Sequence, residues 1–308
     1  MFSLPREGNI APEFSLPWRF SLIIAGFPLR IRARIQEQGF SSMIDSPRAK
    51  IGFRAFGAAC LALVLGTDIA AAQEGPAAEL VLGSGVSISP SYFGSNEYDV
   101  GPDARVRFNY LRVPGLLSFG SAQDDVTAEG FGLRGAFRYI GSRRPSDDDS
   151  LQGTERIDRS LELGIGLGYE AEDWRAFGEV RYGVLGHNAW VGEAGADALF
   201  RPRNDLLINL GPRAHFGSDR FMDTYFGVSG EEAAASPELD EFSASGGLYA
   251  VGVEVGARYA FSESWGLEGA ASYDRLVEDA GDSPITDAGS RDQFGIRLGI
   301  TRTIRLGF

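Results

Sequence analysis

Hydrophobic and polar residues alternate along most of the chain from residue 78 onward, and this period of two is typical of β-strands. The stretch 252–276, GVEVGARYAFSESWGLEGAASYDRL, shows the pattern twice. Val253 and Val255 fall on one face of the first run and Glu254 on the other, and the polar turn 262–264 separates it from the second run. The two runs therefore predict a β-hairpin. The alternation alone leaves open whether the apolar face packs inside a core or faces lipid.

The same pattern predicts a succession of strands and little helix. A helical period of 3.6 does not persist over any long stretch after residue 78. We predict strands at 78–89, 103–111, 115–121, 129–140, 158–169, 173–184, 189–200, 205–216, 244–261, 264–277 and 292–308.

The connections between these strands fall into two length classes, which alternate from residue 158 onward. Three are short turns, at 170–172, 201–204 and 262–263, and three are long polar segments, at 141–157, 217–243 and 278–291. The connection 186–188 is the one short member of the second class. Aromatic residues gather at both strand ends, as expected at two membrane interfaces. Sorted loops and aromatic rows are the layout of an outer-membrane barrel. We therefore predict an all-β fold, a transmembrane antiparallel up-and-down β-barrel, with its apolar face toward lipid.

The number of strands is the least certain feature of this barrel. Eleven strands are counted, whereas a bacterial single-chain barrel has an even number. Counted back from the C-terminus, the regular alternation of upward and downward strands fails between residues 103 and 130. We therefore expect a further short strand near 121–130 and favour 12 strands over 10. Arg302 shares its face with apolar Ile300 and Ile304. A lipid-facing Arg at the membrane centre costs about 2–4 kcal/mol, so Arg302 is expected near an interface or beside a bulge.

A secretory signal peptide precedes the predicted barrel. Residues 43–72 combine a basic start, an apolar run over 56–65 and the small residues 70–72, after which we predict cleavage. A short membrane anchor or a buried helix is the alternative, but the apolar run is too short to span a bilayer. We interpret residues 1–42 as an extension from an upstream start, and residues 73–308 as the barrel domain.

Charge and cysteine content narrow the possible partners. The 308 residues include 29 basic and 42 acidic side chains, for a net charge of −13. Removal of residues 1–72 would leave 21 basic and 37 acidic side chains, a net charge of −16. This balance argues against nucleic acid as a partner. The single cysteine, Cys60, lies in the predicted signal peptide, so the mature chain would contain no disulfide and no thiolate site.

The polar face of the predicted barrel carries charges of both signs. Such a mixture can pair across neighbouring strands and fill a narrow interior. This favours a scaffold or interaction barrel in the cell envelope, with a small-solute pore as the alternative. The candidate lumen-lining residues are Arg134, Arg138, Glu162, Glu179, Arg181, Arg213, His215, Glu254, Arg258, Glu268 and Asp274.

No pattern in the sequence requires a catalytic, metal or cofactor site. His215 precedes Ser218 and Asp219, but a Ser-His-acid set is recognised by geometry rather than by spacing. Hydrogen bonding in the lumen is the simpler interpretation of His215, and His187 is expected at a loop tip. The glycine-rich runs 130–135 and 164–168 lack the following helix that a phosphate site needs. We predict no enzyme activity and no cofactor, and keep a lipid hydrolase as the third alternative.

Three segments have motifs distinctive enough for comparison: SPSYFGSNEYDVGP at 89–102, LINLGPRAHFGSDRFMDTYFGVS at 207–229 and LVEDAGDSPIT at 276–286. Together with a Gly-His pair between two strands, they resemble the MipA/OmpV family of outer-membrane proteins, the MltA-interacting protein family. The residues that carry the resemblance are Tyr92, Gly94, Ser95, Gly186, His187, Gly211, Pro212, Tyr225, Phe226, Gly227, Val228, Asp279, Ala280, Asp282, Ser283 and Pro284.

The resemblance implies an outer-membrane barrel without known enzymatic activity and with a scaffold role in murein synthesis. It implies a murein synthase and a lytic transglycosylase as candidate partners, beside the outer-membrane lipid that surrounds the barrel. The chain ends in Phe308. A terminal aromatic residue on a last strand resembles the signal that the barrel insertion machinery reads.

Overall fold

The computed structural model describes residues 19–24, 27–32, 78–113, 117–120, 129–146 and 148–306. The predicted signal peptide 43–72 and the terminal Phe308 lie outside these ranges. Both therefore stay predictions.

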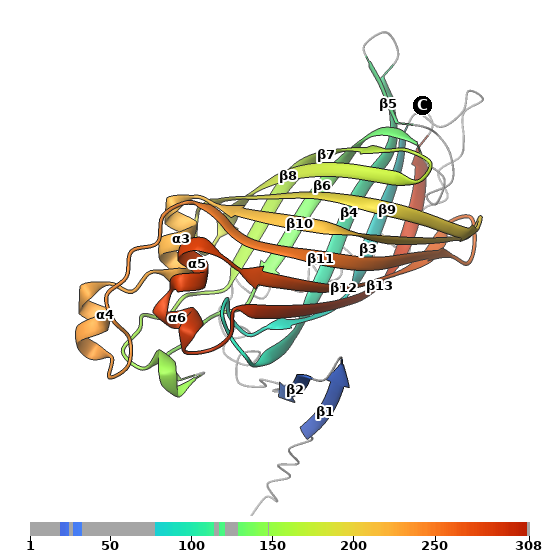
Figure 1. The fold of residues 1–308 in the computed structure, drawn as a ribbon. Helices are drawn as coiled ribbons and strands as arrows, with labels where there is room; N and C mark the ends of the chain where they lie inside the picture. Colours follow the sequence, from blue (N-terminus) through green and yellow to red (C-terminus); the bar gives the residue numbers. More distant parts are fainter. Residues whose placement is uncertain are drawn as a thin grey trace, which may run out of the picture.

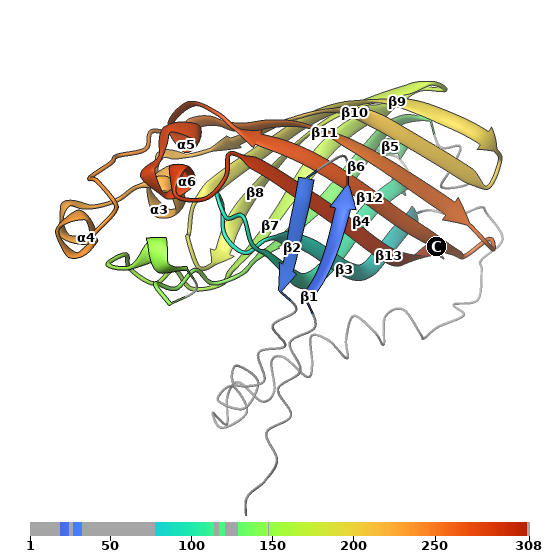
Figure 2. The same ribbon diagram turned by 60° about the horizontal axis from the view of Figure 1, so that its bottom comes forward.

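Ten antiparallel strands form a closed barrel (Figures 1 and 2). Strands that follow one another in the chain pair as neighbours, and the pairing of β3 with β13 and of β4 with β6 closes the sheet. The barrel strands are β3 Ala78–Pro90, β4 Tyr98–Val113, β6 Gly130–Ile140, β7 Ser160–Glu170, β8 Trp174–Leu185, β9 Trp190–Arg203, β10 Leu206–Gly217, β11 Gly247–Ala260, β12 Trp265–Leu276 and β13 Asp292–Leu306. The predicted all-β barrel is confirmed.

The favoured number of twelve strands is wrong, and the alternative of ten is confirmed. The predicted strand 115–121 is present only as β5, Leu117–Gly120, which pairs with the end of β4 as a hairpin. β4 then pairs directly with β6. This pairing leaves no place in the wall for β5 or for a further strand near 121–130.

The outer surface of the barrel is apolar. On β7, Leu163, Ile165 and Leu167 are 46%, 62% and 47% exposed, while Glu162, on the alternate face of the same strand, points inward and is fully buried. On β11, Val253 and Val255 are exposed in the same way. Since alternate side chains of a strand lie on opposite faces, the polar residues of the hairpin at 252–276 form part of the interior.

Aromatic side chains lie near both ends of the wall. At the end with the short connections 171–173, 204–205 and 261–264, here called the short-turn end, Tyr169 contacts Trp174 with ring centres 5.5 Å apart. At the opposite end, Tyr182 contacts Trp190 at 4.9 Å. Arg302 pairs with Trp265 beside a short turn, and its guanidinium lies 5.1 Å from the indole centre. Arg302 thus lies near a strand end, as the cost of a lipid-facing charge predicts.

Four short helices cover the end of the barrel opposite the short turns (Figure 1). They lie in the segments predicted as long polar loops, and we call this layer the cap, including the 91–97 and 141–159 segments. The helices are α3 Asp219–Phe226, α4 Gly230–Ala235, α5 Glu278–Asp282 and α6 Pro284–Asp287, with a 3-10 turn η1 at Asp149–Leu151.

Hydrophobic side chains of the cap form the main buried core of the described residues. Phe221, Met222 and Phe226 of α3 are buried together with Ala280 of α5 and Leu276 at the end of β12. α3 begins after Ser218 and ends before Gly227, and its buried residues share one side of the helix. The cap is therefore a packed layer rather than a set of solvated loops.

Two further strands, β1 Arg19–Ile24 and β2 Phe27–Arg32, form a hairpin outside the barrel wall (Figure 2). A single parallel pairing between Ile31 and Tyr98 joins it to β4. In the part of the chain that the structure describes, no helix has both the length and the apolar character to cross a bilayer.

Candidate functional site

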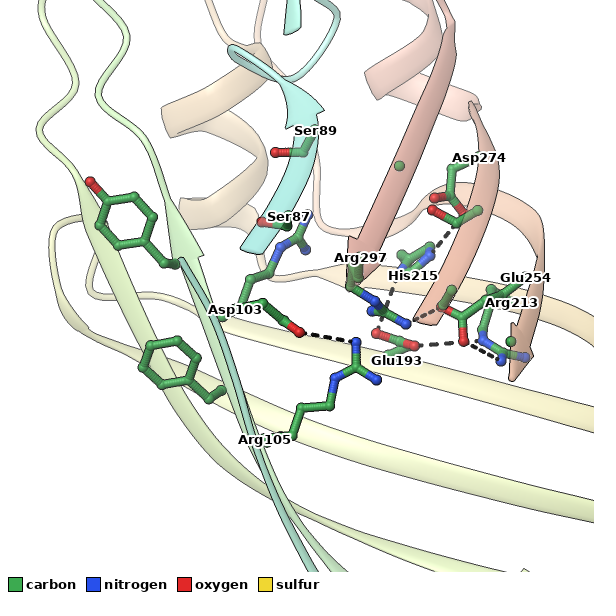
Figure 3. A pocket seen from close by; sticks show the side chains of 18 of the residues that line it. Ser87, Ser89, Asp103, Arg105, Glu193, Arg213, His215, Glu254, Asp274 and Arg297 are labelled. Carbon is green, nitrogen blue, oxygen red and sulfur yellow. Dashed lines mark hydrogen bonds and ion pairs between the residues drawn. The ribbon is translucent and has the colours of Figure 1, made fainter. Parts of the chain in front are cut away.

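The inward-facing side chains enclose a polar cavity of about 320 Å³ below the cap (Figure 3). Ten of the eleven candidate lumen residues line this cavity. The eleventh, Glu162, is fully buried beside it and accepts a hydrogen bond from Arg181 at 2.9 Å. Because alternate side chains of a strand lie on opposite faces, most candidates chosen by parity fall inside the barrel.

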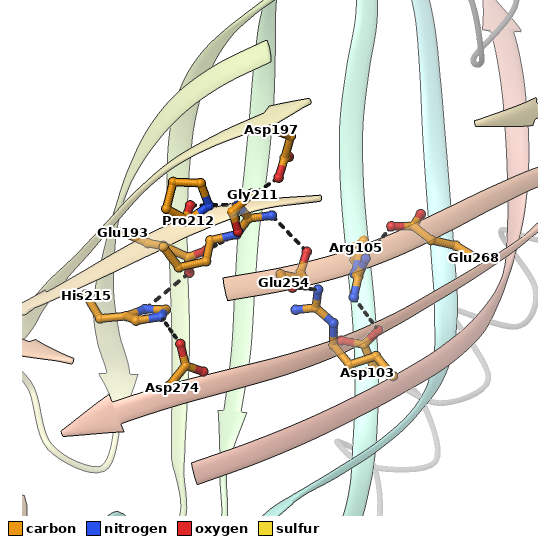
Figure 4. Close-up of polar contacts among 12 residues, drawn as sticks. Asp103, Arg105, Glu193, Asp197, Gly211, Pro212, His215, Glu254, Glu268 and Asp274 are labelled. Carbon is orange, nitrogen blue, oxygen red and sulfur yellow. Dashed lines mark hydrogen bonds and ion pairs between the residues drawn. The ribbon is translucent and has the colours of Figure 1, made fainter. Parts of the chain in front are cut away.

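Arg213 on β10 forms ion pairs with both neighbouring strands, and Figure 4 shows its partners Asp197 and Glu254. Its guanidinium donates to Asp197 on β9 at 2.8 Å and to Glu254 on β11 at 3.0 Å. Asp197 also accepts from Arg175 at 2.6 Å, and Glu254 also accepts from Arg297. The side chains of Arg213 and Asp197 are 3% and 0% exposed. Buried charges of opposite sign therefore satisfy one another.

Other pairs cross the interior between strands that are not neighbours. Arg258 on β11 lies 3.7 Å from Glu170 on β7. Arg105 on β4 pairs with Glu268 on β12 (Figure 4). Arg138 on β6 donates to the hydroxyl of Tyr249 on β11 at 3.1 Å. These side chains fill much of the lumen, as the mixture of signs predicts.

His215 lies between two carboxylates inside the cavity (Figure 3). Its Nε2 is 3.1 Å from Asp274 Oδ1, and its Nδ1 is 3.7 Å from Glu193 Oε2. Ser218 accepts a hydrogen bond from the backbone N–H of Trp190, and Asp219 accepts one from that of Gly246. The Ser and Asp that follow His215 in the sequence are thus engaged elsewhere, and they do not form a catalytic set with it.

His187 lies in the turn between β8 and β9, the loop position expected from the sequence, but its side chain is buried, with 4% of the residue's surface exposed. Gly186 with φ +86° and Asn188 with φ 48° form a tight turn that places the ring beneath the cap. The backbone N–H of Ala189 donates to Nδ1 at 3.1 Å, so Nδ1 is unprotonated and Nε2 carries the hydrogen. Nε2 then donates to Glu162 at 3.2 Å.

A chain of hydrogen bonds joins this turn to the cap. The backbone N–H of His187 donates to Ser160 Oγ at 3.2 Å, and this oxygen lies 3.0 Å from the hydroxyl of Tyr225 on α3. Arg143 donates to the carbonyl of Tyr225 at 2.9 Å. Burial raises the pKa of Tyr225 to about 12 and lowers the pKa of Arg143. α3 is therefore anchored to the wall by polar as well as apolar contacts.

The family-motif residues of four separate segments meet in the cap. Ser283 before α6 donates to the carbonyl of Phe226 at 2.6 Å. Gly94 has φ +90°, and a Cβ added to it would lie only 3.0 Å from the Cα of Thr286. Tyr92 is buried near Asp148, and burial raises its pKa to about 12. Of the motif residues, only Gly211 and Pro212 lie in the wall, on β10.

Two aromatic residues of this site were missed by the sequence patterns. Phe93 lies at the centre of the cap, with its ring 5.0 Å from that of Tyr225 and 6.0 Å from that of Tyr249. Tyr249 belongs by parity to the outer face, but the register shifts between His215 and Phe216 opposite it, and the resulting β-bulge turns Tyr249 inward. The sequence contains no local signal for this bulge.

Among the residues with described positions, no group of three or more His, Cys, Asp or Glu side chains is placed to hold a metal ion. Most charged groups of the lumen are instead paired with one another.

Comparison with known proteins gives one family and several barrels. The model of the family described as MltA-interacting protein MipA matches residues 82–304. No curated protein matches the chain. An outer-membrane channel from Pseudomonas putida is 12% identical, with 78% of this chain and 100% of that chain covered and a TM-score of 0.38. OprG from Pseudomonas aeruginosa is 11% identical, with coverages of 75% and 98% and a TM-score of 0.25. Ail from Yersinia pestis is 12% identical, with coverages of 75% and 100% and a TM-score of 0.27.

Proposed function

The chain belongs to the family of MltA-interacting protein MipA and is an outer-membrane barrel protein, and from this premise we propose that it acts as a scaffold in the cell envelope. Its proposed partners are a murein synthase and a lytic transglycosylase, which it would hold together. The name of the family supports the lytic transglycosylase as a partner. The family is described as interacting with MltA, and MltA is a murein enzyme.

The observation that carries the proposal is the filled and capped lumen. Arg258 and Glu170 meet across the interior, as do Arg138 and Tyr249. The cap core around Phe221 packs over the end of the wall. A wide water-filled channel needs an open interior, so this arrangement favours a protein that presents surfaces over one that conducts solutes. The small-solute pore is the second candidate, and the cavity of about 320 Å³ is the feature that favours it.

The apolar outer wall supports insertion into outer-membrane lipid. Exposed Leu163, Ile165 and Val253 would contact acyl chains. In this orientation the short-turn end faces the periplasm, because barrels of this class have short periplasmic turns. The terminal Phe308, which lies outside the described residues, remains the residue proposed to be read by the barrel insertion machinery.

The surface proposed for the murein enzymes is the short-turn end. There the hairpin of β4 and β5 extends beyond the wall (Figure 1). It pairs from Tyr110–Gly120 to Val113–Leu117, and of these residues only Tyr110 and Leu111 also pair with β3 of the closed ring. A projecting hairpin at the periplasmic end is accessible to a periplasmic or inner-membrane partner without disturbing the barrel.

A binding experiment tests this proposal. Detergent-solubilised protein is immobilised, and a purified synthase and lytic transglycosylase are added separately and together. We expect each enzyme to bind the immobilised barrel when added alone. When both are added, we expect both to be retained, even if the two enzymes do not bind each other directly. Replacement of residues 110–120 by a short turn should abolish at least one of the two interactions.

A matched variant at the other end serves as the control. Replacement of the α4 segment 230–235 by a short turn alters the cap end, and it should leave both interactions intact. Heat-modifiable gel mobility reports whether each variant still forms a barrel. Absence of binding by both enzymes would contradict the scaffold, and large stable conductance steps in planar bilayers would favour the pore.

A further inference from the structure

The wall of the barrel has one weak seam, between β4 and β6. In the described residues these strands pair through only three residue pairs, Val106–Gly135, Arg107–Arg134 and Phe108–Leu133. Every other pair of neighbouring barrel strands is joined by nine or more. On the cap side of the seam, β4 continues with β3 and β6 continues with β7, but they no longer pair with each other.

The polar cavity reaches this seam. Ala136 and Arg138 line the cavity from the inner face of β6, and Phe137 and Tyr139, from the alternate face of the same strand, line it as well. Pro102 and Asp103 do the same for β4. At this level β4 and β6 do not pair, and residues of both strands border the cavity. The cavity therefore lies against the unpaired part of the seam.

The inner side of the seam is rich in guanidinium groups. Nine arginines line the cavity, against six carboxylates. β6 contributes Arg134 and Arg138 and no acidic residue. Arg134 has its nearest carboxylate, Glu179, at 3.9 Å and stacks on Phe177 at 4.1 Å.

Arg138 is the one arginine of the cavity lining that forms no ion pair with a carboxylate among the described residues. Its guanidinium donates to the neutral hydroxyl of Tyr249 at 3.1 Å and lies 5.1 Å from the centre of the Phe93 ring. A guanidinium has five donors in a planar fork that matches a carboxylate or phosphate. Arg138 therefore has donors left for an anionic group that enters the cavity.

The outer side of the seam is apolar. Val86 on β3 and Val100 on β4 are 53% and 59% exposed on the outer surface. A molecule at the seam thus meets hydrocarbon-like surface outside, the aromatic rings of Phe137 and Tyr139 in the gap, and guanidinium groups inside. We propose that the seam between β4 and β6 is a lateral binding site for a single-chain anionic amphiphile, whose headgroup is bound by Arg138 and whose chain lies along the aromatic residues of the gap. A cavity of about 320 Å³ is at the lower end of the range for small-molecule sites, roughly 300–1,000 Å³.

The test uses laurate as the probe and calorimetric titration of the full barrel in dodecyl maltoside, with micelle-only blanks. This detergent has the same alkyl chain without a charge, so heat above the blank reports the headgroup. We expect saturable binding of one laurate per barrel. Arg138→Gln should weaken it by about tenfold or more, because a charge-assisted hydrogen bond is lost, whereas Arg138→Lys should retain part of the affinity.

Two comparisons distinguish this amphiphile site from non-specific charge attraction and from a small-anion site. Arg203→Gln removes an exposed arginine that pairs with Asp205 at the short-turn end, and it should leave binding unchanged. Butyrate, which has the headgroup without the long chain, should bind at least about tenfold more weakly, since less apolar surface is buried. Equal binding of butyrate and laurate would overturn the amphiphile site in favour of a small-anion site. Heat-modifiable gel mobility checks that Arg138→Gln still forms a barrel. If this variant then binds laurate as tightly as the unaltered protein, the proposed role of Arg138 is overturned.

Discussion

Replacement of Arg213 by Met tests whether the ion pairs of the lumen hold the barrel together. The guanidinium of Arg213 lies 2.8 Å from Asp197 and 3.0 Å from Glu254. At an effective dielectric constant of about 20, each attraction is roughly 5–6 kcal/mol before the cost of desolvation, which offsets much of it. Removal of one partner of a buried pair costs about 3–5 kcal/mol. Asp197 keeps Arg175 and Glu254 keeps Arg297, so we expect a loss near the lower end, about 3 kcal/mol.

The measurement is urea unfolding of the protein in lipid vesicles, followed by tryptophan fluorescence. We expect a lower midpoint with an unchanged slope, since the surface exposed on unfolding stays the same. Arg203→Met removes an exposed pair with Asp205 and should leave the midpoint unchanged. Arg213→Lys keeps the charge and should fall between the two. If Arg213→Met and Arg203→Met give the same midpoint as the unaltered protein, the network does not stabilise the barrel.

The remaining predictions concern the cap. Phe221→Ala should destabilise the cap by about 3–5 kcal/mol, because the side chain is fully buried. Protease should then cleave within 218–246 while the heat-modifiable gel mobility of the barrel persists. Loss of this mobility together with the protection of the cap would contradict a cap that unfolds separately from the barrel. Burial opposes ionisation of Glu232, but hydrogen bonds from the N–H groups of Glu155 and Ser229 prevail and lower its pKa. The ionised Glu232 carboxylate therefore stabilises α4 above the unfolded pKa, and this stabilisation is lost as pH falls through the folded pKa. Amide exchange at 229–236 should accelerate in acid, and Glu232→Gln should remove this dependence of exchange on pH. The raised pKa of Tyr225 favours the neutral phenol, so the cap should loosen as pH rises from about 10 toward 12, and Tyr225→Phe should abolish the alkaline change in protease sensitivity.

The wall of the barrel could be predicted because its information is local. Leu163 and Ile165 face outward and Glu162 inward for the same reason that alternate residues of any strand do. The lengths of the connections then distinguish the short-turn end of the barrel from the cap end. Nothing about a distant partner is needed for either conclusion.

The number of strands could not be predicted, because it depends on which strand pairs with which. The segment around β5 has the same composition whether it pairs within the wall or folds back on β4 as a hairpin. The choice is made by the direct pairing of Val106 with Gly135. In the same way, the bulge opposite His215 reverses the direction of Tyr249 without any change in the local pattern.

The contacts inside the site are less predictable than the face on which each residue lies. Parity places Arg258 and Glu170 in the lumen, but only the closed barrel brings β11 opposite β7. His187 shows the same dependence in the cap: the turn at Gly186 is local, whereas burial of the ring needs Phe221 of α3, whose ring centre lies 5.3 Å away. Any apolar residue of suitable size can serve at an outward wall position, while a cap residue such as Ser283 or Tyr225 needs one particular partner. For this reason the motifs that identify the family come mainly from the segments that form the cap, and little identifying information comes from the strands that cross the membrane.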